Sequence, residues 1–222
     1  MRIELWSDYA CPWCALGIYR LDAALQRFAH GDEVSVLHRA FELDPRAPAR
    51  RSETMTEVLA KKYGMNPEQV HAGHERLASL GREVGMDFAF DKIQLGNTFD
   101  AHRLTQAARG TDSEEKLVKG LFSAYFTEGK LLSDHGVLQD VAQVAGVDPD
   151  VAAAVLAGED HAAAVHADET EARELGITGV PHFLINGAWA IPGAQDIETL
   201  VLVLNRAWER SEGSERAGAP SA

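Results

Sequence analysis

The chain has 222 residues and a formal net charge of −13, from 21 Lys and Arg against 34 Asp and Glu. This acidic balance argues against nucleic acid or an anionic membrane as a partner, because either would require a basic surface. A hydrophobic content of 45% is ordinary for a globular protein that builds its core without disulfide cross-links. No apolar run is long enough to span a membrane, and the first residues lack the apolar segment of a secretory signal, so we expect a cytoplasmic protein.

The first predicted element is a strand over residues 3–6, where apolar side chains alternate before Ser7. The only two cysteines of the chain follow in Cys11-Pro12-Trp13-Cys14, and residues 15–28 then repeat apolar side chains at helical spacing. Proline is tolerated in a first helical turn, because the amide that it lacks would have no partner there. We therefore expect Cys11 at or just before a helix N-terminus, with Cys14 one turn further.

This placement predicts redox chemistry. The free amides and partial positive charge of a helix N-terminus stabilise a thiolate over a thiol. Cys11, the outer cysteine, is the predicted nucleophile, and Cys14 is predicted to resolve the mixed disulfide. A three-residue offset brings both sulfur atoms to one face of a helix, close enough to bond. Pro12 and Trp13 have no ionisable group, so we expect them to tune the redox equilibrium through backbone rigidity and exclusion of water.

Two other interpretations of the cysteine pair stay open. His71 and His74 could complete a Cys₂His₂ zinc site, although no further cysteine exists to form a more usual ligand set. The cysteines could also be two unrelated buried residues. The order of strand, motif and helix favours the redox pair over both.

The second predicted strand covers residues 33–41, so that strand, helix and strand form a βαβ unit with parallel strands. Near the C-terminus, apolar residues 181–185 and 188–191 flank Asn186-Gly187, which is the strongest short signal for a hairpin. A final helix is predicted over residues 196–208. The order βαβ then ββα predicts an α/β, thioredoxin-like fold, with its domain made of residues 1–51 and 176–210.

Between these two parts we predict a large all-helical insertion over residues 52–175. Caps, glycines and prolines place its helices at residues 54–63, 66–85, 97–109, 111–126, 134–145, 148–157 and 159–175. The fourth of these helices is predicted to start with a capping box from Thr111 to Glu114. Residues 211–222, rich in Gly, Ser, Ala and Pro, are predicted to be a disordered tail.

Thr178-Gly179-Val180-Pro181 stands immediately before the third predicted strand. Most bonds before proline are trans, and a trans proline is also allowed at the start of a strand. Beside a Cys-x-x-Cys pair, however, we expect a cis bond. The backbone groups of Val180 would then be free to pair with an extended substrate and to align its sulfur with Cys11.

These motifs, together with the Asn97-Thr98-Phe99-Asp100-Ala101-His102-Arg103-Leu104 stretch, resemble the DsbA family over about residues 1–210, and more narrowly its cytosolic FrnE-like branch. The resemblance implies a dithiol–disulfide oxidoreductase without a metal or organic cofactor. It carries over Cys11 as nucleophile, Cys14 as resolving cysteine and Pro181 as the cis-proline. It also implies that Asn97 and His102 line a groove between insertion and core, while a plain helix-surface role remains the alternative for His102.

The same branch includes glutathione-dependent 2-hydroxychromene-2-carboxylate isomerases and kappa-class glutathione transferases. Those relatives have serine at the position of Cys11, so the two cysteines favour redox exchange, and an isomerase or transferase is the alternative function. A third hypothesis is a non-enzymatic module that binds peptides. Expected partners are proteins or small molecules with thiols or disulfides, glutathione or another small thiol as co-substrate, and an external reductant or oxidant. A homodimer is left open, because no heptad run marks an interface.

Overall fold

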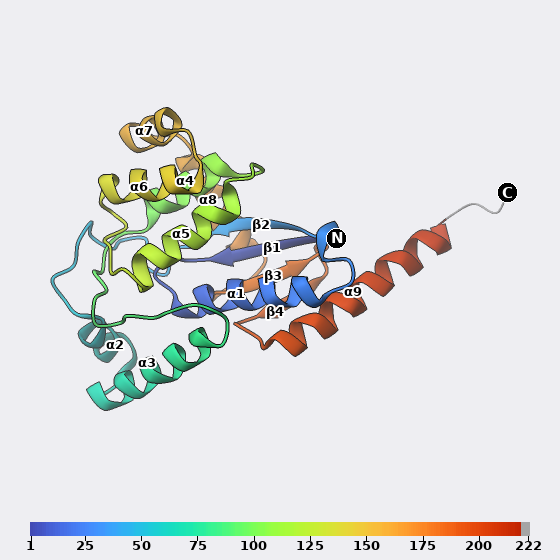
Figure 1. Ribbon diagram of the computed structural model, residues 1–222, viewed down its shortest axis with the longest axis horizontal. Coiled ribbons are helices and arrows are strands. Elements are labelled where there is room, and N and C mark those ends of the chain that lie inside the picture. Colours follow the sequence, from blue (N-terminus) through green and yellow to red (C-terminus); the bar gives the residue numbers. More distant parts are fainter. Residues whose placement is uncertain (219–222) are drawn as a thin grey trace.

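The computed structural model describes the backbone of residues 1–218 and side chains up to Ser211. Its centre is a four-stranded sheet in the order β2-β1-β3-β4. β1 (Arg2–Ser7) pairs in parallel with β2 (Ser35–Ala40) and antiparallel with β3 (His182–Ile185), which in turn pairs antiparallel with β4 (Trp189–Pro192). In Figure 1, β1 and β2 from the N-terminal part of the chain (blue) lie beside β3 and β4 from the C-terminal part (orange). The predicted α/β thioredoxin-like fold is confirmed.

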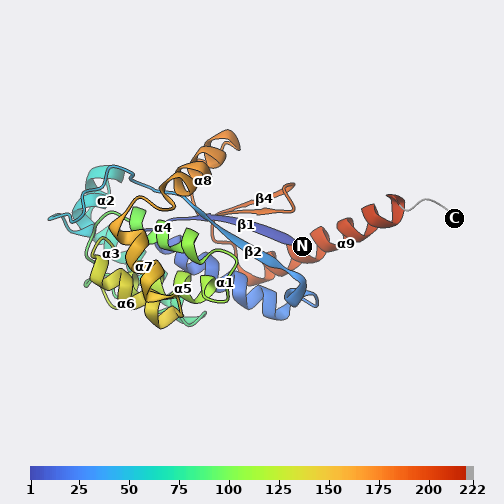
Figure 2. The same cartoon turned by 90° about the horizontal axis from the view of Figure 1, so that it is seen from above.

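Helices cover both faces of the sheet, and the alternation of side chains along β1 explains how. Ile3 and Leu5 point to the larger core, where α1 (Pro12–Arg27) packs with α9 (Ile197–Gly218). Trp6 points to the opposite face and packs with Ala172 of α8 (Ala162–Glu174). Because successive residues of a strand face opposite sides, one buried strand serves two layers. Figure 2 shows α8 on one side of the sheet and α1 on the other.

The insertion is helical, as predicted. Besides α8, its helices are α2 (Met55–Tyr63), α3 (Pro67–Arg82), α4 (Phe99–Ala108), α5 (Glu114–Phe126), α6 (His135–Ala145) and α7 (Pro149–Ala157). Side chains of Thr54, Asn66, Asp134 and Asp148 cap four of these helices at the predicted positions. How the insertion divides from the core as a domain stays a prediction.

Several predicted helix ends differ from the structure. α8 begins at Ala162, after His161 in a left-handed conformation, and not near Glu159. The capping box at α5 does not form, because Thr111 donates to Ala108 O and Glu114 instead accepts from Gly110 N. α9 continues to Gly218, so residues 211–218 of the predicted tail are helical. No proline interrupts the helix before Pro220. Residues 219–222 of that tail lie outside the described part.

The C-terminal hairpin has the predicted turn. Asn186 and Gly187 both have positive φ, 49° and 67°, as a type I′ turn requires. The turn joins β3 to β4. Because β3 pairs with both β1 and β4, it is an interior strand of the sheet. Among the described helices, none combines the length and apolar character that crossing a membrane requires.

Candidate active site

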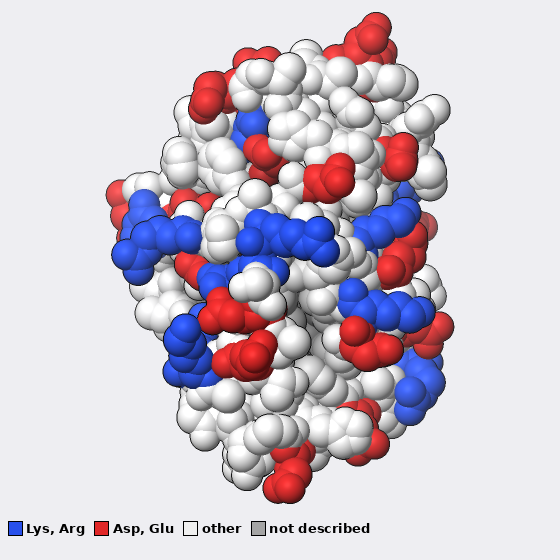
Figure 3. Space-filling view, turned by 90° about the vertical axis from the view of Figure 1, so that its left-hand side faces the viewer, with Lys and Arg blue, Asp and Glu red and all other residues white. Residues whose placement is uncertain are grey.

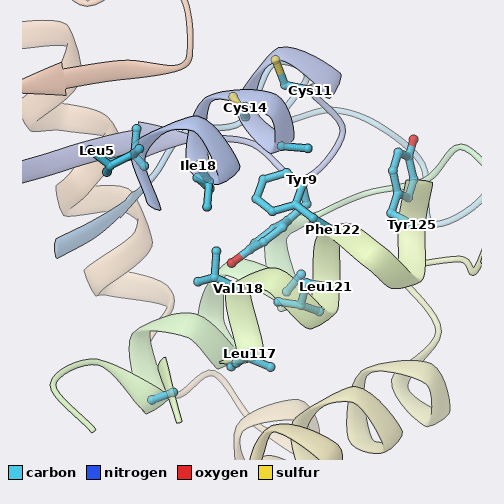
Figure 4. Packing of buried hydrophobic residues seen from close by; sticks show 14 of the residues in the cluster. Leu5, Tyr9, Cys11, Cys14, Ile18, Leu117, Val118, Leu121, Phe122 and Tyr125 are labelled. Carbon is cyan, nitrogen blue, oxygen red and sulfur yellow. The ribbon is translucent and has the colours of Figure 1, made fainter. Parts of the chain in front are cut away.

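The two cysteines lie where the sequence predicted, at the start of α1. Cys11 is the N-cap residue in extended conformation, Pro12 is in the first turn, and Cys14 is fully buried one turn later. Both are free thiols, and their sulfur atoms point to the same side of the helix (Figure 4). Burial raises the pKa of the Cys14 thiol well above its usual range, and its hydrogen bond with Cys11 and the charge of Cys11 add to this effect. Cys11, at the helix start, is itself buried at 5% exposure, and Cys14 lies one turn behind it with no exposed surface.

The other side of the site comes from the far end of the sequence. The Val180–Pro181 peptide bond is cis, in agreement with the expectation from its context. The Cys11 thiol donates to the Val180 carbonyl oxygen at 3.6 Å. Val180 precedes the first paired residue of β3, His182, so its backbone lies outside the sheet ladder. Trp13, the second middle residue of the motif, is 40% exposed beside this contact.

Asp8 is a site residue that sequence reasoning did not single out. Its carboxylate is buried and accepts from Ala10 N at 3.1 Å, from Leu43 N at 2.7 Å and from Thr98 Oγ1 at 2.9 Å. Its backbone carbonyl accepts from Cys11 N at 3.0 Å. Burial acts to raise the pKa of Asp8, but the charge of nearby His102 and the hydrogen bonds from the backbone of Leu43 and Ala10 outweigh it and hold the pKa of this carboxyl below its usual value. One buried carboxylate thus joins three chain segments, through Ala10, Leu43 and Thr98, and its residue is hydrogen-bonded through the backbone to Cys11.

Glu42 and His102 lie beside this carboxylate. His102 is 3% exposed, its Nε2 is 3.8 Å from Asp8 Oδ1, and its ring packs against Tyr9 with centroids 4.9 Å apart. Glu42 follows the end of β2 and is also buried. Burial is the main cause that raises the pKa of Glu42 to about 7, and the nearby Glu169 and Asp8 charges add to it while His102 opposes it. The carboxyl ends of β1 and β2 therefore meet in a cluster of buried ionisable groups.

Asn97 connects this cluster to the loop after β2. Its amide donates to Glu42 Oε1 and to Ala47 O, both at 3.4 Å, and its Oδ1 accepts from Phe99 N at 2.8 Å. Asn97 is half-buried, whereas the ring of His102 faces Asp8 in the interior. The structure thus places His102 beside Asp8 and Asn97 beside Glu42, and the role of both residues in substrate binding stays a prediction.

The face around the start of α1 has a mixed charge. Figure 3 views the end of the molecule that lies at the left of Figure 1, where α1 begins, and a broken row of Lys and Arg side chains crosses it among Asp and Glu. The loop between β2 and α2 lies at this end and includes the exposed Arg46 and Arg50. Although the chain has a net charge of −13, this face therefore carries both positive and negative side chains.

His71 and His74, the histidines of the zinc alternative, lie on α3. They line a cavity of about 670 Å³ between α3 and residues 50–56 and 88–95, and neither cysteine lines it. His71 Nε2 is 3.4 Å from Glu75 Oε1, and the ring of His74 stacks on the ring of Phe90 with their centroids 4.0 Å apart. Within residues 1–218, no three His, Cys, Asp or Glu side chains are grouped so as to hold a metal ion.

Comparison with known proteins places the whole core of this chain in one family. Residues 2–205 match the model of the DSBA-like thioredoxin domain. The crystal structure of a probable DsbA oxidoreductase from Streptomyces coelicolor is 38% identical, covers 94% of this chain and 90% of its own, and superposes with a TM-score of 0.89. The uncharacterized protein YwbO of Bacillus subtilis is 26% identical over 87% of this chain and 90% of its own length.

A more distant likeness concerns the fold alone. The structure of a 2-hydroxychromene-2-carboxylate isomerase is 14% identical and superposes with a TM-score of 0.72 over 96% of this chain and 98% of its own. The arrangement of strands and insertion is thus shared with a protein named as an isomerase, and a fold alone does not fix an activity.

Proposed function

Because this chain belongs to the DSBA-like thioredoxin domain family, we propose that it is a thiol–disulfide oxidoreductase that acts through Cys11 and Cys14. The observation that carries the proposal is the position of Cys11. Its thiol lies at the N-cap of α1 and 3.6 Å from the Val180 carbonyl, with Cys14 one turn behind. Two thiols and a backbone segment outside the sheet ladder thus lie together, which supports the roles of nucleophile, resolving thiol and substrate-binding segment.

The reaction follows from this order of thiols. The Cys11 thiolate attacks one sulfur of a substrate disulfide, a mixed disulfide forms, and the first substrate thiolate leaves. Cys14 then loses its proton to the solvent or to the leaving thiolate and attacks Cys11 Sγ. The second substrate thiolate leaves, and the Cys11–Cys14 disulfide remains. The substrate gains two electrons in total, and the reverse sequence oxidises a dithiol. In the forward direction an external thiol or reductase recycles the enzyme, because this chain has no third cysteine.

Asp8 and the cis-proline segment position the reacting groups. The Asp8 carboxylate joins Leu43, Thr98 and the residue before Cys11, which fixes the start of α1 relative to the loop after β2. The backbone of Val180 is placed to pair with an extended substrate segment and to direct its sulfur toward Cys11. We propose disulfide-containing proteins or small disulfides such as oxidised glutathione as substrates.

The test compares Cys11→Ser and Cys14→Ala with the wild-type protein in the reduction of insulin by glutathione. Cys11→Ser is expected to lose the activity entirely. Cys14→Ala is expected to accumulate mixed disulfides on Cys11, which mass spectrometry identifies. Because burial raises the pKa of Cys14, the wild-type resolution step is expected to accelerate as the pH rises above neutral.

The same variants separate this function from the glutathione-dependent isomerase or transferase. If Cys11→Ser kept full turnover with glutathione and an aromatic acid while insulin reduction was absent in the wild type, the proposed exchange reaction would be wrong. The captured substrates then distinguish a protein-folding role, with large proteins on Cys11, from small-thiol metabolism.

A further inference from the structure

A second cavity lies away from the cysteines, at the edge of the sheet. It has a volume of about 300 Å³ and is formed by β2, α1 and the first turns of α5. Val36 and His38 both face it, because residues two apart on a strand point to the same side. Ile18 of α1 and Val118 of α5 line it from the two helices and point toward one another in Figure 4. Its wall therefore combines an apolar part with polar and charged side chains, among them His38 and Glu114.

Two of the residues that line this cavity have buried polar atoms without partners. His38 is 7% exposed and Glu114 is 8% exposed, and both line the cavity. Glu114 Oε2 accepts from Gly110 N at 2.7 Å, but Glu114 Oε1 and His38 Nδ1 have no hydrogen-bond partner anywhere in the described structure. Buried polar atoms are nearly always paired, so two of them in one small cavity point to a ligand with hydrogen-bond donors.

The charges around the cavity favour a cationic donor. Asp22, Glu114 and Glu115 line it, and Lys119 Nζ forms ion pairs with Asp22 and Glu115, both at 2.5 Å. Three carboxylates and one ammonium leave a local charge of 1 − 3 = −2. Arg109 is the other cation that acts on His38, and its guanidinium is paired with Asp168 at 2.8 Å.

The protonation state of His38 supports the same conclusion. Burial is the main cause that lowers the pKa of His38 to about 4, with Arg109 and Lys119 adding to it and Glu115 opposing it. The ring is therefore neutral at pH 7 and offers one lone pair as an acceptor. A neutral acceptor beside a net negative charge suits a protonated amine better than an anion or a neutral molecule.

We propose that this cavity is a binding site for a short primary alkylammonium. Its ammonium donates to Glu114 Oε1 and His38 Nδ1, and its carbon chain packs between Ile18, Val36 and Val118. The site is separate from the redox pair, although α1 contributes to both.

The experiment titrates the full-length protein with n-butylammonium chloride and follows methyl groups of Ile18, Val36 and Val118 by NMR. We expect saturable shifts with a dissociation constant on the order of 1 mM, reasonable for a ligand of five heavy atoms. n-Butanol, which has a similar shape without the charge, is expected to bind at least about tenfold more weakly. Equal binding of butanol, or no saturable shift with butylammonium, would show that the cavity holds only water or adventitious apolar molecules and would overturn the proposal.

Two variants and a control locate the binding. Glu114→Gln keeps the size of the side chain and is expected to weaken butylammonium binding at least about tenfold. Val36→Phe fills the cavity from the edge strand and is expected to abolish binding, which decides the matter even if the Glu114 variant fails to fold. Glu209→Gln, on the exposed surface of α9, is expected to bind as the wild type does. Unchanged binding in Val36→Phe would contradict the site.

Discussion

At the scale of single residues, the site contains buried ionisable groups. They differ in the hydrogen-bond donors that stabilise their charged forms. Asp8 has three hydrogen-bond donors and keeps its charge. Glu42, which follows the end of β2, has only a long hydrogen bond from Asn97. Burial without strong donors favours the neutral carboxyl, which explains why the two acids differ.

Glu42→Gln is expected to stabilise the protein at alkaline pH. Because the folded pKa of Glu42 is raised from 4.5 to about 7, its contribution to stability is present below pH 4.5 and is lost as the pH rises to about 7. Glutamine cannot ionise and so removes this loss. The free energy of unfolding of the variant should therefore exceed that of the wild type by on the order of 2 kcal/mol at pH 8 and by almost nothing at pH 4. Urea unfolding at both pH values measures this. The exposed Glu83→Gln is the matched control, and an equal gain at both pH values would contradict the explanation.

At the scale of elements, α8 is held by a polar anchor more than by an apolar face. Its buried residues are Val165, Asp168 and Ala172. The Asp168 carboxylate accepts from Ala40 N at 3.0 Å, and from three side chains of β2, α4 and the residue after α4: Arg39 at 2.6 Å, Gln106 at 2.6 Å and Arg109 at 2.8 Å. One carboxylate thus joins the last helix of the insertion to the edge strand of the sheet.

Asp168→Asn is expected to lower the free energy of unfolding by about 1–3 kcal/mol, because it removes the charge of a buried acceptor that binds Gln106 and the half-buried Arg39 and Arg109. Thermal or urea unfolding measures the loss. Asp140→Asn on the exposed side of α6 should change stability by less than about 0.5 kcal/mol. If Asp168→Asn were as mild as this control, α8 would be held mainly by its apolar contacts.

At the scale of the whole molecule, the site forms where α1, near the start of the chain, packs against the cis-proline segment before β3. Gly17 of α1 faces the cis-proline segment, and a Cβ at this position would lie 3.1 Å from Pro181 Cγ and 3.3 Å from Phe183 Cζ. The absence of a side chain therefore lets α1 approach β3 closely. This approach sets the distance between Cys11 and Val180.

Gly17→Ala is expected to lower both stability and disulfide reduction, because the crowding against Pro181 exceeds the gain in helix propensity. We expect a net loss of about 1 kcal/mol in the free energy of unfolding. Gly73→Ala on α3, where an added Cβ meets nothing within 4 Å, should instead gain about 0.5–1 kcal/mol. Parallel unfolding curves and insulin assays compare the two, and a gain at Gly17 would show that α1 can move away without consequence.

The sequence by itself determined the parts whose signals are local. Period-two alternation, the Asn186-Gly187 turn and side-chain caps such as Thr54 predicted most strands and helices. The spacing of Cys11 and Cys14 and the proline between them placed the redox pair at a helix start. These features depend on neighbouring residues, so the sequence contains them directly.

Only the tertiary structure decided which distant residues act together. Asp8 is visible in the sequence as an acid before the cysteine motif, but its donors come from Leu43 and Thr98, which no local pattern connects to it. The same holds for the burial of Glu42 and His38, whose pKa values depend on packing against other elements. Burial and charge act through space, not along the chain. The motif therefore identified the reactive sulfur atoms, while the fold decided which groups surround them.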